Sequence, residues 1–229
     1  MCKQLGKSHC SELTEDIAAW SKDAPLAKPE WITGSIDVFV DCLTLAMDGE
    51  IVQARELIKH SRDVDLRAWF DDHAQNTGTW RYKSLGVNAP EAVLPLDPEK
   101  NVMKFQMEIF SRDNYRCRYC ESKVIPKSVF KRVQGILGQD PSGFDYVPLG
   151  QTNMTRSGFY LMFAATLDHV IPWSLGGRTE ASNLVTCCWS CNYGKMNYTL
   201  EQLGLNNPFE REPHSDTTWK GLEDYVLRT

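Results

Sequence analysis

The chain has 229 residues, of which 42% are hydrophobic and 24% are charged, a composition typical of a globular protein with its own core. No stretch of the sequence approaches the ~20 apolar residues that a membrane helix requires, so we expect no membrane protein. The opening residues, MCKQLGKSHCSELTED, contain no apolar segment, so we expect no secretory signal and a cytoplasmic location.

The formal net charge of −5 excludes a protein that coats nucleic acid simply through a basic surface. The charge is unevenly distributed, however. Residues 1–100 hold 11 basic and 17 acidic side chains, residues 101–200 hold 11 and 7, and residues 201–229 hold 3 and 6. A polyanion is therefore expected to meet the middle of the chain first.

The N-terminal hundred residues are predicted to be helical. Ser11, with Thr14 and Glu15 nearby, forms a candidate capping box at the start of a first helix. Apolar residues then recur at helical spacing between residues 36 and 58, with a predicted break at Asp48-Gly49. The stretch VDLRAWFDDHA, residues 64–74, predicts a further helix.

Three prolines within nine residues, at positions 90, 95 and 98, predict a linker over residues 85–101. A short amphipathic helix is expected after it, in the stretch VMKFQMEIFSRDNY, residues 102–115, which leads into Cys117. Residues 121–167 contain the sequence GILGQDPSG and are expected to form an elaborated loop. The apolar run FYLMFAA, residues 159–165, predicts a strand that stops at Asp168 and His169. A second strand over 183–188 and a helix from about Trp189 to Leu203 are expected to follow.

Four of the eight cysteines form two pairs with C-x-x-C spacing, Cys117 with Cys120 and Cys188 with Cys191. Two such pairs can supply four thiolates to one tetrahedral Zn²⁺ ion. Four reduced thiols in a core are the alternative. Cys187 could compete with Cys188, but only Cys188 has the C-x-x-C spacing to Cys191. A site with four thiolates is closed, so we expect a structural zinc and look for catalysis elsewhere.

The neighbouring side chains Asp168 and His169 are the candidates for catalysis. A histidine with a pKa near 6.5 can accept a proton from water at neutral pH. A carboxylate is a hard oxygen ligand suited to Mg²⁺. A base beside a metal ligand suits hydrolysis of a phosphodiester, whereas an isolated Asp-His pair would be an ordinary surface feature.

The sequence LDHVIPWSLGGRTEASNLVTCCWSCNYGK, residues 167–195, resembles the core of the HNH endonuclease family. The preceding RDNYRCRYC resembles the segment that opens the zinc-ribbon type of that family. The resemblance runs from about Val102 to Lys195 and is interrupted by residues 121–167. It implies a ββα-metal fold, in which two strands and a helix surround one divalent ion.

The resemblance also implies roles for individual residues. His169 would be the general base that activates water, and Asp168 and Asn192 would hold the catalytic Mg²⁺ or Mn²⁺. Asn183 would brace the loop between the strands, and the products would carry 5′-phosphate and 3′-hydroxyl ends. Lys195 and Arg178 are candidate phosphate contacts.

The 47 residues between Cys120 and Asp168 are longer than the compact family pattern. Lys127, Lys131, Arg132 and Arg156 in this insertion form either an additional DNA contact or a solvated face. The sequence leaves the two alternatives open.

These observations predict an α+β fold: a helical N-terminal domain over residues 1–97, an HNH domain over 98–205 with an insertion at about 121–167, and an extension over 206–229. The expected function is metal-dependent hydrolysis of DNA, most simply double-stranded. The N-terminal domain could hold a protein partner or form a homodimer. A zinc-stapled nucleic-acid-binding module without catalysis and an RNA-directed nuclease are the alternatives. Restriction and phage defence are among the settings that use such a module.

Overall fold

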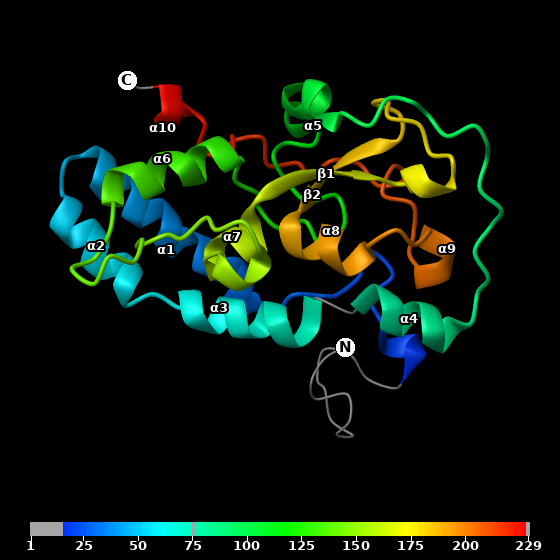
Figure 1. Cartoon of the computed structure of the whole chain (residues 1–229), viewed down its shortest axis with the longest axis horizontal. Helices are drawn as coiled ribbons and strands as arrows, with labels where there is room; N and C mark the ends of the chain where they lie inside the picture. The colour runs from blue at the N-terminus through cyan, green and yellow to red at the C-terminus, as the bar shows by residue number, and fades with distance from the viewer. Residues whose placement is uncertain (1–15, 75–76, 228–229) are drawn as a thin grey trace.

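Figure 1 shows the computed structural model of the chain, which describes residues 16–74 and 77–227. Within these ranges the fold is mostly helical, with one sheet of two antiparallel strands. None of the described helices is long and apolar enough to cross a membrane. In chain order the helices and strands are α1 (Glu30–Met47), α2 (Ile51–Lys59), α3 (Asp63–Trp69), α4 (Thr77–Leu85), α5 (Gln106–Arg112), α6 (Lys127–Leu137), α7 (Gly158–Phe163), β1 (Ala165–His169), β2 (Leu184–Cys188), α8 (Trp189–Lys195), α9 (Leu200–Leu203) and α10 (Asp224–Leu227).

Helices α1 and α2 pack against each other because their apolar residues lie on one face each. The buried residues of α1 recur every three or four positions, which is the period of a helix: Ile32, Ile36, Phe39, Leu43 and Ala46. Gly49 sits between the helices with φ at +85°, a conformation that favours glycine. The predicted break at Asp48-Gly49 is therefore confirmed.

The helix predicted over residues 64–74 is also confirmed. It begins at Asp63 and runs as α3 to Trp69, and a π-helical turn extends it over Phe70–Ala74. The candidate capping box at Ser11 lies outside the described residues.

Helix α7 lies at the centre of the molecule, and all six of its residues are buried. It packs against α1, α3 and α8, as Figure 1 shows. Gly158 makes the approach to α3 possible, because a β-carbon there would come within 2.1 Å of the carbonyl oxygen of Asp63. The strand predicted over 159–165 is therefore wrong for most of its length. A helix that is apolar on all sides has no periodicity that distinguishes it from a buried strand.

The segment 121–157 is not the elaborated loop that its composition predicts. It contains α6, an 11-residue helix whose buried residues Val129, Phe130, Val133 and Leu137 form one apolar stripe. Phe130 packs on Phe39 of α1, with ring centroids 4.9 Å apart. The glycines and the proline of GILGQDPSG belong to the end of α6 and the turns after it.

Strands β1 and β2 form a hairpin, in which Asp168 faces Val185 and His169 faces Leu184 in the register. Helix α8 starts directly after β2 and packs against both strands. The helix expected to run to Leu203 is interrupted at Met196, where φ is +56°. It continues as the separate helix α9, which Thr199 and Gln202 cap reciprocally. The hairpin and α8 form the ββα unit.

The predicted linker is extended and lies along the outside of the molecule between α4 and α5, as Figure 1 shows. It is tied to the loop between β1 and β2. Val93 donates a backbone hydrogen bond to the carbonyl of Leu175, and the Trp173 indole donates to the carbonyl of Asp97 at 2.8 Å. This segment, which we call the strap (residues 93–101), therefore contacts the ββα unit directly.

One hydrophobic core connects the N-terminal helices with the second half of the chain. Helix α3 packs on α7, and α4 packs on α8 and α9. The division of the chain at residue 97 stays a prediction. The packing implies that the N-terminal helices support the helix and hairpin that carry the predicted site.

Candidate functional site

The four paired cysteines lie close together, two from the segment after α5 and two from the junction of β2 and α8. The Sγ atoms of Cys117, Cys120, Cys188 and Cys191 all lie within 4.8 Å of one another. The Cys120 and Cys188 sulfurs are 3.7 Å apart, which is too long for a disulfide. Zn–S bonds of ~2.3 Å in a tetrahedron place sulfurs about 3.8 Å apart, so the cluster fits Zn²⁺.

Cys187 is not a member of this cluster. Its Sγ lies 3.3 Å from the carbonyl of Cys188, and its side chain is fully buried. Strand geometry explains the separation, because neighbouring residues of β2 project to opposite faces. The spacing to Cys191 therefore identified the correct one of the two adjacent cysteines in the cluster.

A lysine from the N-terminal part of the chain contacts the cluster. The Nζ atom of Lys28 lies 3.2 Å from Cys188 Sγ and donates to the carbonyl of Met162 at 3.1 Å. Burial opposes its charge, but the surrounding thiolates raise the pKa of Lys28 well above its ordinary value. Four thiolates around Zn²⁺ carry a net charge of −2, so this ammonium offsets part of that charge.

Lys28→Met is expected to weaken zinc binding about tenfold, the usual cost of losing an interaction behind a metal ligand. Competition with a zinc chelator measures the affinity, and Lys59→Met provides a control at an exposed lysine on α2. Equal zinc affinity in both variants would show that the Lys28 contact is unimportant to the site.

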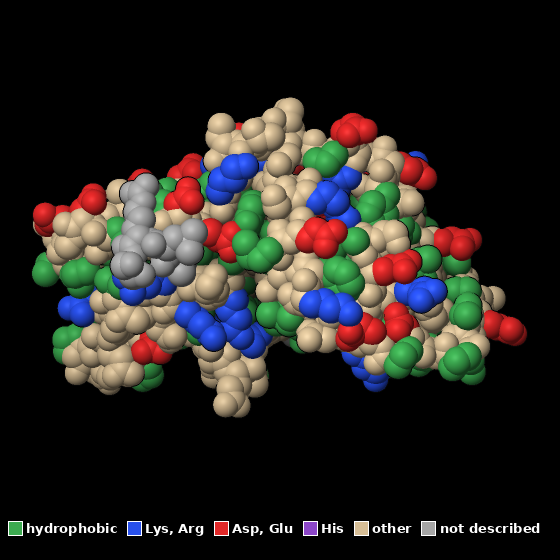
Figure 2. Space-filling model, turned by 90° about the horizontal axis from the view of Figure 1, so that it is seen from above, with side chains coloured by type: hydrophobic (Ala, Val, Ile, Leu, Met, Phe, Trp, Pro, Cys, Tyr) green, Lys and Arg blue, Asp and Glu red, His purple; other side chains and the backbone are tan. Residues whose placement is uncertain are grey.

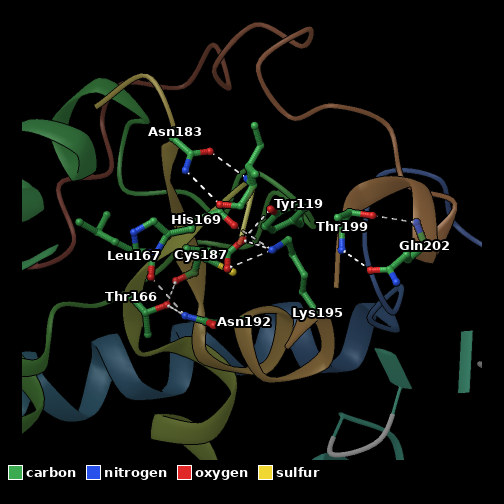
Figure 3. A network of polar contacts seen from close by, with 12 residues as sticks. Tyr119, Thr166, Leu167, His169, Asn183, Cys187, Asn192, Lys195, Thr199 and Gln202 are labelled. Carbon is green, nitrogen blue, oxygen red and sulfur yellow. Dashed lines mark hydrogen bonds and ion pairs between the residues drawn. The ribbon is translucent and has the colours of Figure 1, made fainter. Parts of the chain in front are cut away.

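A cavity of about 580 Å³ lies against the end of β1 and the face of α8. It brings together three residues that the sequence predicts for catalysis, Asp168, His169 and Asn192. Its lining consists of Leu167, Asp168, His169, Pro172, Trp173, Asn192, Tyr193, Met196 and Asn197. Figure 3 shows the polar contacts of this region, with His169, Asn192 and Lys195 among the side chains drawn as sticks. We call this space the catalytic cavity, after the role that the sequence predicts for these three residues.

Asp168 is buried and held by two donors. The Tyr119 hydroxyl donates to Oδ2 at 2.7 Å, and Lys195 Nζ lies 3.2 Å from the same oxygen. Burial, and then the negative charge of Asp168, raise the pKa of Tyr119 well above its ordinary value, so the phenol remains a donor. These two partners fix the carboxylate at the wall of the catalytic cavity.

Lys195 is fully buried and also donates to the carbonyl of His169 at 2.9 Å. In this position it neutralises Asp168 and does not reach solvent. A phosphate contact by Lys195 stays a prediction, and it would require this ion pair to open. Arg178, in contrast, is 75% exposed in its side chain and lies 3.8 Å from Glu180.

Among the residues that the structure describes, His169 makes one side-chain hydrogen bond, and this bond determines its tautomer. Its Nε2 lies 2.9 Å from Thr179 Oγ1, and that hydroxyl donates its single proton to the carbonyl of Glu99 at 2.6 Å. The hydroxyl can therefore only accept from the ring, so Nε2 carries the proton and Nδ1 keeps the lone pair. Burial lowers the pKa of His169, although Asp168 partly opposes this effect, so the shift favours the neutral ring.

Asn192 is attached to β1 through its amide nitrogen. Nδ2 donates to Thr166 Oγ1 at 2.6 Å and to the carbonyl of Leu167 at 3.3 Å. Figure 3 shows the nitrogen directed at the strand. Among the described residues, Oδ1 accepts no hydrogen bond, so this oxygen remains to meet a ligand.

Asn183 braces the loop between the strands. Its Oδ1 accepts from the backbone N–H of Ile171 at 2.8 Å, and Nδ2 donates to the carbonyls of Ile171 and Arg178 at 3.0 and 2.9 Å. Gly177 permits this closure, because a β-carbon there would lie 1.9 Å from the Ile171 oxygen. Asn183 is thus placed to shape the loop.

The residues that sequence reasoning missed are Tyr119, Thr179 and Asp97. Tyr119 stands between Cys117 and Cys120, so its position beside the zinc cluster was visible but its bond to Asp168 was not. Asp97 belongs to the strap, and its Oδ2 accepts from the backbone N–H of Thr179 at 2.8 Å. Nothing in the proline-rich sequence of the strap predicts its contact with Thr179, which lies 82 positions beyond Asp97 and is the hydrogen-bond partner of His169.

Comparison with known proteins gives one family. Residues 163–207 match the family model described as HNH endonuclease. The matched segment includes β1, β2, α8 and α9, two of the four clustered cysteines, and every residue that lines the catalytic cavity. No curated protein and no solved structure matches the chain. The chain therefore contains, at residues 163–207, a domain of the HNH endonuclease family.

Proposed function

We propose that the protein is a metal-dependent endonuclease that hydrolyses phosphodiester bonds of DNA in the catalytic cavity. The observation that carries the proposal is that Asp168, His169 and Asn192 line one cavity within the segment that matches the HNH endonuclease family. The match by itself supports a nuclease; the substrate and the roles of individual residues belong to the proposal.

His169 acts as the general base. Thr179 holds Nε2 as the protonated nitrogen, so Nδ1 is the atom that accepts a proton from water. Because the lowered pKa of His169 favours the neutral ring, it is ready to accept. The hydroxide then attacks phosphorus in line with the leaving 3′ oxygen.

Asp168 and Asn192 are the residues that would hold Mg²⁺ or Mn²⁺. A carboxylate and a carboxamide oxygen are the hard donors that these ions take, and both side chains are fixed by hydrogen bonds to other groups. When bound, the ion supplies charge stabilisation for the phosphate and the leaving oxygen. Lys195 already neutralises Asp168, so the carboxylate would be shared between the ammonium and the ion.

The same ion pair favours a second candidate function. A carboxylate paired with a fully buried lysine can also have a purely structural role, which is consistent with a zinc-stapled nucleic-acid-binding module without catalysis. Incubation with supercoiled plasmid, linear duplex and RNA, each with Mg²⁺, Mn²⁺ or EDTA, separates the two functions. We expect metal-dependent cleavage of duplex DNA, whereas binding without cleavage under every condition would favour the module.

Thr179→Val is expected to lower kcat about tenfold or more while KM stays unchanged. Valine preserves the shape but removes the acceptor for His169 Nε2–H, so the ring loses its fixed tautomer and the base loses part of its contribution. Steady-state cleavage of a labelled duplex measures both constants. Thr179→Ser keeps the hydroxyl and should retain most of the wild-type rate. Equal rates for valine and serine variants would contradict the assignment.

A further inference from the structure

A second cavity, of about 500 Å³, lies between α5, α6 and β1. Figure 2 shows the molecule from above the view of Figure 1, with lysine and arginine side chains gathered beside a hollow near the middle of this face. We call the second cavity the insertion groove, because α6 and Arg156 of the insertion form one wall. Its lining includes Met103, Met107, Lys127, Lys131, Arg156 and Trp189.

The insertion groove adjoins the catalytic cavity at β1. Leu167 lines both spaces, and Thr166 lines the groove while its hydroxyl accepts from Asn192 in the catalytic cavity. Strands rise ~3.3 Å per residue, so Thr166 lies about 10 Å along β1 from His169. A nucleic-acid strand held at His169 therefore reaches the groove within a few nucleotides.

The groove is basic although the whole chain has a net charge of −5. Lys127 and Lys131 lie one turn apart on α6 and are exposed. Within the described part of the chain, neither side chain makes a hydrogen bond or an ion pair. Glu223 is the acidic residue of the lining, and it is engaged by the Tyr115 hydroxyl. The two lysines therefore have their charge available for a polyanion.

Arg156 adds a rigid cation to the same wall. Its guanidinium donates to the Gly150 carbonyl and to Asn153 Oδ1, and it lies over the ring of Trp189 at 4.6 Å. These contacts hold the charge at the groove but use much of the donor capacity of Arg156. Lys127 and Lys131 are therefore the residues whose substitution tests whether the groove binds a polyanion or is only solvated.

We propose that the insertion groove binds the sugar-phosphate backbone of the nucleic acid beside the bond that is cut, with Lys127 and Lys131 as phosphate contacts. This inference rests on the proposed function for the identity of the bound molecule. It assigns the insertion that interrupts the family pattern a role in substrate binding. The exposed Met103 and Met107 supply an apolar opposite wall for sugars.

The test measures binding without cleavage. His169→Ala protein is titrated with a fluorescent DNA duplex at several salt concentrations, and log Kd is plotted against log salt. Each phosphate contact contributes ~0.9 to the slope, so Lys127→Gln with Lys131→Gln should reduce the slope by about 2. Binding near 0.1 M salt should weaken roughly tenfold.

Lys59→Gln, which removes the charge of an exposed lysine on α2, is the control for loss of a surface charge outside the groove. In the same His169→Ala protein it should leave the slope unchanged. An unchanged slope in the Lys127/Lys131 variant would overturn the proposal and would indicate that the groove meets another partner, such as an acidic protein segment. Failure of the proposed function looks different: the wild type would bind with the full slope and cleave nothing.

Discussion

Cys188→Ala is expected to abolish zinc binding and to destabilise the whole second half of the chain. The four-thiolate cluster joins the segment after α5 to the end of β2 and the first turn of α8. Structural zinc contributes about 10–16 kcal/mol of apparent binding free energy in small zinc domains, more than the total stability of many proteins. Loss of the ion therefore removes the support of Asn192, which follows Cys191 directly.

The adjacent cysteine provides a matched control for this prediction. Cys187→Ala removes a buried thiol that lies outside the cluster, so it should keep one zinc per chain and cost only a small cavity. Zinc content by elemental analysis and thermal unfolding by circular dichroism compare the two variants. Equal zinc loss in both, or full zinc retention by Cys188→Ala, would contradict the assignment of the ligands.

His169→Ala is expected to lower cleavage by about 10²–10⁴-fold, the usual contribution of a general base. Removing the half-buried imidazole of His169 costs its hydrogen bond to Thr179. We expect the zinc content and the fold to stay intact. Nicking of supercoiled plasmid measures the rate. His60→Ala, at an exposed histidine after α2, serves as the control and should cleave like the wild type. Wild-type cleavage by the His169 variant would exclude it as the base.

The sequence predicted the parts of the fold that depend on local pattern. Helical spacing located α1, α2 and α3, and C-x-x-C spacing located all four clustered cysteines, including the choice of Cys188 over Cys187. The motif around Asp168 predicted the hairpin and α8. In each case the decisive residues lie within a few positions of one another in the chain.

The missed features depend on contacts between distant segments. The run FYLMFAA became α7 and the start of β1 because it is buried on all sides, which removes the periodicity that separates helix from strand. The bonds of Asp168 to Tyr119 and of Thr179 to the strap join residues 49 and more than 80 positions apart. Composition in the strap, which is rich in proline, predicts only that the chain is extended there.

The ion pair between Asp168 and Lys195 is another contact that the local sequence pattern does not predict. The motif places both residues in the domain, and sequence reasoning directs the lysine to phosphate. In the fold its ammonium is buried against the carboxylate and the His169 carbonyl, and a contact with phosphate stays a prediction. A buried charge needs a partner, so the lysine pairs with Asp168 and fixes the strand end that carries His169.

The central claim is that a divalent ion and His169 together hydrolyse DNA in the catalytic cavity. The most direct measurement follows cleavage of a labelled duplex by zinc-loaded protein. The protein is kept in a buffer free of other divalent ions, Mg²⁺ is titrated in, and the zinc content is determined at each point. We expect cleavage to rise with Mg²⁺ at constant zinc and to be lost in His169→Ala. Folded protein with its zinc in place that binds the duplex but leaves it intact at every Mg²⁺ and Mn²⁺ concentration would contradict it.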